Sequence, residues 1–350
     1  MKNIQLYLSL IAILLSLTAC QEKENGMVIT SLELSLSKSR IVGDNSDYST
    51  VTVVDQEGRS VMGLVTIYFG STVITGDKIK YSAPLKSKVY AEYNNIKSNE
   101  AEIEVIEDSG LKFEKNVLIE QYTGTWCGWC PRAINQINLL EINDKKIVHS
   151  ALHLSDVFAY SLNNSLFKSF GFAGVPTVHA DRSLVWEGDE SSIYYLHSPS
   201  RIGISIEVTG DASNITAAVK VKFGYEYPEG LELSVYLTHD SLVAGQANYY
   251  NTDPSSPYYQ KGTTMADFVH RNVLIKAGTD MFGDAIPSGS VTIGGIYSKN
   301  IVFTNFRCDD IRKISIIALV SVQDGKQAGK VANCIKARVG EKKEFVTAGS

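Results

Sequence analysis

A cysteine pair follows an apolar, strand-like segment and comes directly before a helical pattern. Residues 117–122 read as a strand, a glycine-containing turn follows, and Cys127 and Cys130 precede a helical pattern over residues 131–140. A thiol at a helix N-terminus faces unpaired backbone N–H groups and the positive end of the helix dipole. Both favour the thiolate, so the pKa of Cys127 should fall below the free value of about 8.5. The spacing predicts a redox pair in which Cys127 attacks and the more buried Cys130 resolves the mixed disulfide.

A proline loop further along the chain strengthens this interpretation. The string Gly174-Val175-Pro176-Thr177, together with Trp126 before the cysteines, resembles the cis-proline loop that faces the Cys pair in thioredoxins. The resemblance implies a cis Val175–Pro176 bond, which would present the backbone of Val175 to an extended substrate chain. It assigns Trp126, Val175 and Pro176 to a substrate groove.

The strand before the motif departs from the thioredoxin pattern. Thioredoxins keep a buried acid there, but Gln121 stands at that position and Glu120 lies one residue earlier. An extra residue in the turn 123–125 would bring Glu120 into register, so we assign Glu120 as the proton acceptor; a half-buried strand glutamate is the alternative. Gly128 and Trp129, inside the motif, leave the redox direction open.

Two other interpretations of the cysteine pair stay open. One is a stable, non-catalytic disulfide on a degenerate scaffold. The other is a zinc site, because His149 and His153 follow at a loosely finger-like spacing. Both histidines fall in an apolar strand, and a zinc finger has no need of the proline loop, so we expect neither a metal nor another cofactor. His153, near the end of its strand, is interpreted as a satisfied strand histidine; a position beside the cysteines is the alternative.

The N-terminus decides the compartment. Lys2 and the apolar residues 4–17 fit a signal peptide of residues 1–19, which is too short to span a bilayer. The string Leu17-Thr18-Ala19-Cys20 resembles a bacterial lipobox, which implies lipid on Cys20 and a membrane anchor; a chance cysteine after an ordinary signal peptide is the alternative. The polar, acidic residues 20–26 read as a tether and resemble a cell-surface export signal.

The remaining chain divides into three regions by pattern. Residues 27–107 alternate like a small immunoglobulin-like β-sandwich, residues 108–200 follow the strand–helix order of a thioredoxin-like domain, and residues 201–350 are β-rich again. The predicted fold class is therefore an α/β thioredoxin-like domain flanked by all-β sandwich domains. A long Tyr-rich connection, residues 245–267, interrupts the last region. Plain loop packing is the favoured interpretation, and packing over the neighbouring domain or a part in binding is the alternative.

Two further cysteines, Cys308 and Cys334, lie in the last region. In an oxidising compartment they are expected to pair, and such a loop would stabilise the domain by roughly 3 kcal/mol. Two separate thiols are the alternative. The net charge of −5, without a long basic run, excludes a typical nucleic-acid-binding protein.

The combination of features resembles one family of outer membrane proteins. The lipobox, the segment 117–131 and the string His270-Arg271-Asn272-Val273-Leu274 are similar to the outer membrane protein 28-related lipoproteins of Gram-negative anaerobes, over residues 110–340. The resemblance implies an outer-membrane location, facing either the periplasm or the cell surface, and a thioredoxin-like core. Adhesion or receptor roles are suggested for such proteins.

Two functions follow from these observations. The first is a membrane-anchored thiol–disulfide oxidoreductase acting on exported or surface protein thiols through Cys127 and Cys130, with a redox partner that the sequence does not name. The second is a surface protein for binding or adhesion that carries a non-catalytic scaffold.

Overall fold

The computed structural model describes residues 28–323 and 328–349, and these form two compact units that divide between Asp108 and Ser109. The predicted signal peptide, Cys20 and the tether lie outside the described residues. No helix within the described ranges has both the length and the apolar character needed to cross a membrane.

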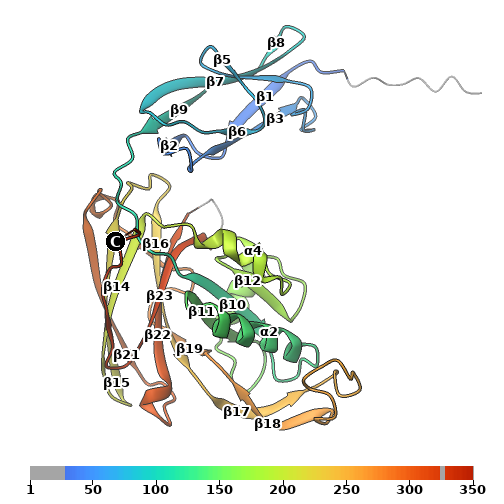
Figure 1. The fold of residues 1–350 in the computed structure, drawn as a ribbon, viewed down its shortest axis with the longest axis vertical. Coiled ribbons are helices and arrows are strands. Elements are labelled where there is room, and N and C mark those ends of the chain that lie inside the picture. The colour runs from blue at the N-terminus through green and yellow to red at the C-terminus, as the bar shows by residue number, and fades with distance from the viewer. Residues whose placement is uncertain (1–27, 324–327, 350) are drawn as a thin grey trace, which may run out of the picture. The chain divides into compact units, whose positions relative to one another are not determined.

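The first unit consists of two β-sheets that share one core. The strand orders are β1-β3-β6 and β2-β9-β7-β4-β5, with β8 paired to β7 (Figure 1). Alternation within β3 places Val51 and Val53 inside, where they belong to the same apolar cluster as Val89 and Ile103. The strands are β1 (Leu32–Leu36), β2 (Arg40–Val42), β3 (Ser49–Asp55), β4 (Thr66–Phe69), β5 (Thr72–Ile74), β6 (Lys78–Ile79), β7 (Leu85–Tyr93), β8 (Ile96–Lys97) and β9 (Ala101–Ile106).

The second unit begins with a mixed α/β segment and continues as β-structure. The α/β segment comprises β10 (Val117–Thr123), α2 (Cys130–Asn143), β11 (Ile147–His153), α3 (Asn163–Ser169), β12 (Thr177–Ala180), β13 (Leu184–Val185) and α4 (Glu190–Tyr194). The strands that follow are β14 (Ile202–Gly210), β15 (Asn214–Phe223), β16 (Leu231–His239), β17 (Leu242–Ala247), β18 (Thr264–His270), β19 (Val273–Ala277), β20 (Asp284–Ile286), β21 (Ile296–Thr304), β22 (Ile314–Val322), β23 (Lys330–Arg338) and β24 (Lys342–Lys343).

The predicted fold class is wrong, because the α/β segment is not a separate thioredoxin-like domain. Its strands belong to a nine-stranded sheet in the order β13-β12-β10-β11-β19-β16-β22-β23, with β20 on β16. The link is a parallel contact between β11 and β19, at Ala151 and Val273. The free edge of β11 would expose backbone N–H and C=O groups, and β19 covers it. The unit is therefore mostly β-sheet, and no domain boundary falls near residue 200.

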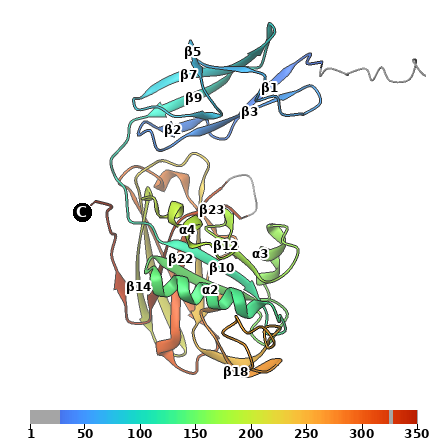
Figure 2. The same cartoon turned by 45° about the vertical axis from the view of Figure 1, so that its right-hand side comes forward.

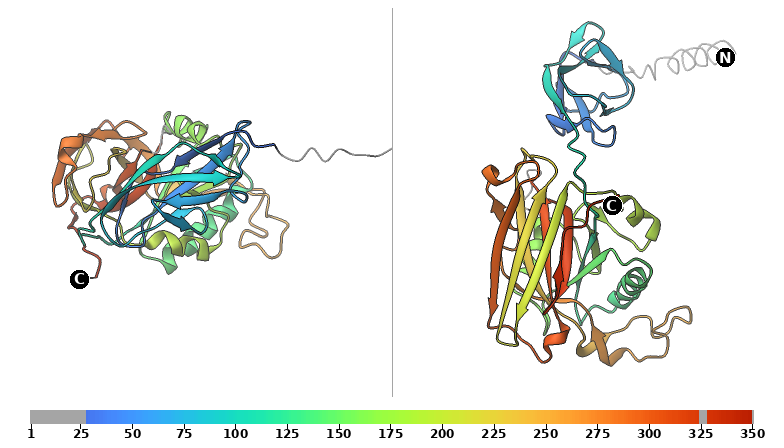
Figure 3. Two further views of the ribbon diagram at one scale, coloured as in Figure 1. Left: turned by 90° about the horizontal axis from the view of Figure 1, so that it is seen from above. Right: turned by 60° about the vertical axis from the view of Figure 1, so that its left-hand side comes forward.

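A second sheet packs against the C-terminal part of the nine-stranded sheet. It has the order β21-β15-β14-β24, and Figure 3 shows its long strands side by side. Alternate residues such as Val219 and Val221 of β15 share one buried cluster with Val235 and Leu237 of β16. This sandwich is the largest apolar core of the unit.

The helix α2 covers one face of the α/β segment (Figure 2). Val117 and Ile119 of β10 cluster with Ala133 and Ile137 of α2. The alternate residues of β10 point to the opposite face, where Leu118 and Tyr122 join a cluster with residues of β16, β22 and β23. The two faces of β10 therefore have different roles, and only one of them lies under α2.

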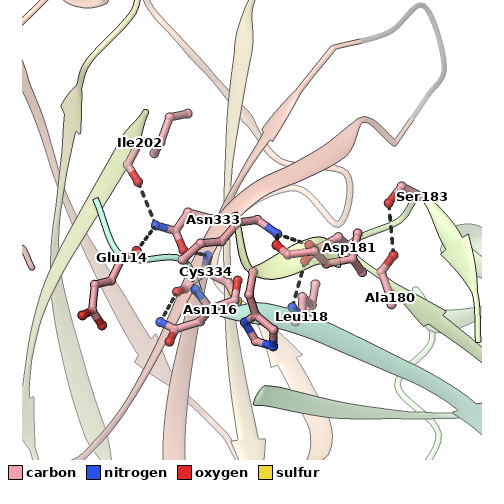
Figure 4. Close-up of polar contacts among 12 residues, drawn as sticks. Glu114, Asn116, Leu118, Ala180, Asp181, Ser183, Ile202, Asn333 and Cys334 are labelled. Carbon is pink, nitrogen blue, oxygen red and sulfur yellow. Dashed lines mark hydrogen bonds and ion pairs between the residues drawn. The ribbon is translucent and has the colours of Figure 1, made fainter. Parts of the chain in front are cut away.

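Hydrogen bonds join the α/β segment to the sandwich strands (Figure 4). The Asn333 side-chain amide donates to the carbonyl oxygens of Glu114 at 3.0 Å and Ile202 at 2.7 Å, and its oxygen accepts from the amide of Asn116 at 3.1 Å. The Asp181 carboxylate accepts from the amide of Leu118 at 2.9 Å and also pairs with the Lys115 ammonium group. The Asn333 contacts hold the residues just before β10 against β14 and β23, and the Asp181 contacts join the start of β10 to the turn after β12.

A buried ion pair lies beside this junction. The Arg182 guanidinium donates to Glu120 Oε1 at 2.8 Å and to the Tyr236 hydroxyl at 2.8 Å. Both charged side chains are fully buried. Burial acts to lower the pKa of Arg182, but the Glu120 carboxylate outweighs it and raises that pKa well above its ordinary value.

We predict that Arg182→Met destabilises the second unit by about 3–5 kcal/mol, because it leaves the Glu120 charge buried without its partner. Chemical denaturation followed by circular dichroism would measure the change. Arg312→Met is the matched control, since Arg312 pairs with Asp310 while its side chain is 86% exposed, and its effect should be much smaller than that of Arg182→Met because water screens an exposed ion pair. Equal effects of the two substitutions would contradict the prediction.

Candidate functional site

The two cysteines lie where β10 connects to α2. Cys127 is in the connecting turn and Cys130 is the first residue of α2, and we call residues 124–130 the cysteine turn. Cys127 and Cys130 are joined by a disulfide. The turn is closed by the Cys127 amide donating to the Gly124 carbonyl at 3.0 Å and the Cys130 amide donating to the Cys127 carbonyl at 3.2 Å. Pro131 follows in the first turn of α2, where its missing N–H breaks no helical hydrogen bond. The pair thus sits at the N-terminus of a helix.

The disulfide is much more covered than the sequence suggests. Cys127 is the less buried of the two cysteines, yet only 4% of its surface is exposed, and Cys130 has none exposed. The flanking Trp126 and Trp129 are, by contrast, more than half exposed. Other parts of the chain therefore cover the two cysteines, although the neighbouring indole rings are exposed.

The antiparallel hairpin of β17 and β18 with its Tyr-rich connection, residues 242–270, lies against the cysteine turn, and we call it the cap hairpin. The Ala247 amide donates to the Thr125 carbonyl at 2.9 Å, and the Tyr249 amide donates to the Gly128 carbonyl at 3.0 Å. The Gln246 side-chain amide is fully buried and donates to the Cys127 carbonyl at 2.8 Å. The cap hairpin therefore binds the backbone carbonyls of the cysteine turn, through two of its own backbone amides and the Gln246 side chain.

Aromatic contacts complete this cover. The Trp129 ring meets the rings of Tyr249 and Tyr250 edge-on, at centroid distances of 5.3 and 5.5 Å. Gly128 leaves room for Tyr249, because a Cβ at Gly128 would lie 2.4 Å from Tyr249 Cδ1. A glycine inside the motif thus permits the close approach of the cap hairpin.

Sheet topology explains why the cap hairpin lies here. It is inserted between β16 and β19, and β19 runs parallel to β11 with Val273 opposite Ala151. The start of β19, and the hairpin just before it, therefore lie near the carboxyl end of β11. The cysteine turn leaves the carboxyl end of the neighbouring, parallel β10, so the two meet (Figure 1).

The proline loop lies at the same end of β10. The Val175–Pro176 peptide bond is cis, as predicted. Thr177 pairs with Tyr122 near the last residue of β10, so the loop before Thr177 adjoins the departure point of the cysteine turn. Trp126 is fixed by a 2.9 Å hydrogen bond from its indole N–H to the Leu154 carbonyl. The predicted groove residues thus gather around one end of the sheet.

Glu120 does not serve this site, which corrects the assignment of a proton acceptor. Its side chain is on the face of β10 opposite α2 and is engaged by Arg182. Gln121 is the residue that shares the α2 face with Val117 and Ile119, in line with strand alternation. A neutral amide therefore occupies the position where an acid was sought.

A histidine–aspartate pair beside the turn was only partly anticipated. His153 Nδ1 is 2.6 Å from Asp156 Oδ2, and the same oxygen accepts from the Thr125 amide at 2.8 Å. Burial acts to raise the pKa of Asp156, but His153 and the amides of Thr125 and Phe158 outweigh it and lower that pKa. The result is a carboxylate that anchors the start of the cysteine turn. Asp156 carries no motif signal, whereas the Tyr-rich segment was visible as an unusually long connection.

The histidine alternative for a metal site has no support in the geometry. His149 is buried, its Nδ1 is 3.2 Å from the Asn272 amide, and burial lowers its pKa to about 3. Within residues 28–323 and 328–349, no group of three or more His, Cys, Asp or Glu side chains is arranged to hold a metal ion.

The predicted disulfide between Cys308 and Cys334 is wrong, because both are free thiols. Cys308 packs against the sandwich core, whereas Cys334 belongs to the cluster on the other face of the nine-stranded sheet. Strands β22 and β23 separate the two faces. The Cys334 thiol lies 3.5 Å from the Asn116 carbonyl, and burial raises its pKa well above the ordinary value.

Comparison with known proteins places the chain in a family. The family described as Outer membrane protein Omp28 matches residues 163–343, which is more than half of the chain. The chain belongs to the Omp28 family. Membership agrees with the predicted family and with an outer-membrane lipoprotein. The match includes the cap hairpin but not the cysteine turn.

Two solved structures from Porphyromonas gingivalis are similar. HBP35 has a TM-score of 0.53 at 18% identity, over 65% of this chain and 76% of HBP35, which shows a shared fold. A domain of the outer membrane lipoprotein Omp28 has a TM-score of 0.24 at 14% identity, over 40% of this chain and 88% of that chain. No curated protein matches the sequence significantly.

We predict that the second unit loses stability as pH falls from about 6.5 to about 4, in part through His270 of the cap hairpin. Burial and the nearby His153 lower the pKa of His270 from 6.5 to about 4. In this interval the unfolded chain binds a proton that the folded chain refuses, so acid favours unfolding. Urea titrations at pH 7 and pH 4.5 should show a smaller acid-induced loss in His270→Gln than in the wild type. An equal loss in the two proteins would contradict this.

Proposed function

We propose that this protein is a membrane-anchored thiol–disulfide oxidoreductase that exchanges disulfides with exported proteins through Cys127 and Cys130. The observation that carries the proposal is the disulfide at the N-terminus of α2, next to the proline loop. Thiolates in this position are stabilised by the helix dipole and by free N–H groups, which makes them good leaving groups.

The reaction balances as two exchanges. A substrate thiolate attacks Cys127 Sγ, the Cys127–Cys130 bond breaks, and Cys130 leaves as a thiolate that takes a proton from water. A second substrate thiolate then attacks the substrate sulfur of the mixed disulfide and releases Cys127. The substrate loses two electrons and two protons, which the protein retains as two thiols. The same steps in reverse, with a second disulfide-bonded exported protein, restore the Cys127–Cys130 bond.

Residues around the cysteine turn would position the substrate and the disulfide, but none of them would transfer a proton to Cys130. Trp126 and the Val175–Pro176 loop lie at the end of β10 where a substrate chain would approach. Asp156 and His153 hold the start of the cysteine turn. With Gln121 at the α2 face of β10 and Glu120 engaged elsewhere, proton transfer to Cys130 falls to solvent.

A second function is favoured by one observation. The disulfide is almost fully buried and the cap hairpin bonds to the turn that carries it, as expected of a stable disulfide in a binding or adhesion protein whose scaffold is non-catalytic. The two proposals differ in whether Cys127 forms a mixed disulfide with a substrate cysteine.

We further propose that lipid on Cys20 holds the protein in the outer membrane and that Glu22 and Glu24 direct it to the cell surface. Protease added to intact cells should digest the wild-type protein but spare Glu22→Ala/Glu24→Ala, with both proteins remaining in the membrane fraction. Digestion of both alike would contradict the role of the acidic tether.

The oxidoreductase proposal predicts that reduced Cys130→Ser forms a stable mixed disulfide with a disulfide-bonded substrate such as insulin. Cys127 attacks, but no neighbouring thiol releases the product. Non-reducing electrophoresis and mass spectrometry would detect the adduct at Cys127. Cys127→Ser is the matched control and should form no adduct, because Cys130 is fully buried. Absence of an adduct in Cys130→Ser, together with no insulin reduction by the wild type, would favour the binding protein instead.

A further inference from the structure

We infer that the cap hairpin occupies the place of a substrate peptide, and that the site recognises extended polypeptides with an aromatic side chain that displaces it. The recognition of a substrate peptide rests on the proposed function. The burial of the disulfide and the hydrogen bonds from the cap hairpin to the cysteine turn are, however, properties of the structure itself.

The first step is access to the sulfur atoms. An attacking thiolate must come close to Cys127 Sγ, but Cys127 retains only 4% of its surface. The carbonyl groups of Thr125, Cys127 and Gly128 are all engaged by the cap hairpin. Exchange with a protein substrate therefore requires the segment 246–250 to leave the cysteine turn.

The carbonyl groups of the cysteine turn determine what kind of chain can bind there when the cap hairpin leaves. The Ala247 and Tyr249 amides donate to Thr125 and Gly128 as an added extended chain would, and such main-chain bonds do not depend on sequence. Once the cap hairpin lifts, these carbonyls offer the same partners to any extended polypeptide. The turn thus selects extended, unfolded segments over folded surfaces.

The third step is the preference for an aromatic residue. The Tyr249 ring lies over Gly128 and against the edge of Trp129, while 59% of its surface stays exposed. A ring held so openly can be replaced by one from outside. An incoming Tyr, Phe or Trp would recover the contact with Trp129 that the displaced Tyr249 gives up.

The cap hairpin competes strongly because it is part of the same chain. A tethered segment acts at an effective concentration on the order of millimolar. A free peptide should therefore bind poorly to the wild type and better to a variant whose cap is weakened. This competition would keep the disulfide unreactive until a suitable chain arrives.

The test uses full-length variants and needs no catalytic turnover. The open variant is Gln246→Ala/Tyr249→Ala, with Tyr249→Ala alone in reserve should the double variant not fold. Tyr259→Ala is the matched control, because Tyr259 lies in the same connection and its amide bonds within that connection, to Ser256. The probe is a fluorescent peptide copying residues 245–251, Gly-Gln-Ala-Asn-Tyr-Tyr-Asn.

We expect dithiothreitol to reduce the Cys127–Cys130 disulfide about tenfold faster in the open variant than in the wild type or in Tyr259→Ala. The peptide should bind the open variant, and replacing its first tyrosine by alanine should abolish binding. Adding Gly128→Ala to the open variant should leave reduction fast but block the peptide, because the new Cβ takes the space of the aromatic ring.

Two results would overturn the inference. Equal reduction rates in the open variant, the wild type and Tyr259→Ala would show that the cap hairpin does not limit access. Fast reduction without peptide binding, or binding that ignores both the tyrosine and Gly128→Ala, would show that the site does not recognise aromatic peptides. Failure of Cys130→Ser to trap a substrate, with these outcomes as expected, would count against the oxidoreductase proposal alone.

Discussion

The parallel pairing of β11 with β19 is the contact on which the arrangement of the second unit depends. It is short, with Ala151 opposite Val273 and the Ala151 amide bonded to the Asn272 carbonyl at 2.9 Å. It nevertheless joins the strands of the α/β segment to those of the sandwich in one sheet. Without this pairing, the α/β segment would form a sheet of its own, separate from the sandwich, and the edge of β11 would lack a partner strand.

That pairing also determines where the chain between β16 and β19 must lie. Because β19 starts beside the carboxyl-terminal half of β11, the cap hairpin is placed at the end of the sheet where the cysteine turn begins. This sheet contact thus positions the cap hairpin against the turn that carries the disulfide. The same geometry brings His153 and His270 within 5.1 Å of each other, which links the base of the cap to the end of β11.

Local sequence patterns predicted the parts of the site that are close in the chain. The strand, turn and helix around Cys127 follow from the residues themselves, and the cis bond before Pro176 was implied by the resemblance to the thioredoxin proline loop. The separate thioredoxin-like domain was wrong, because alternation in a strand does not reveal which strand will pair with its edge. The same gap explains Cys308 and Cys334, since their positions on opposite faces of one sheet depend on long-range pairing.

Glu120 illustrates a second kind of failure. A shift of one residue along a strand moves a side chain to the other face, so its role could not be transferred from a neighbouring position. The partner that fixes it, Arg182, lies in the turn between β12 and β13, and no local pattern connects the two. The contact of Gln246 with the cysteine turn was not predicted for a similar reason, whereas the Tyr-rich connection that carries Tyr249 was marked by its length and its tyrosines.

Hydrogen exchange in a trapped complex would test most directly whether the cap hairpin yields its place to a substrate. The relevant amides are those of Ala247 and Tyr249, which donate to the cysteine turn in the closed structure. With a substrate chain held on Cys127 of Cys130→Ser, both amides should lose protection relative to the same variant without substrate. Unchanged protection of both amides in the complex would mean that a substrate reaches Cys127 with the cap closed, which would contradict the account.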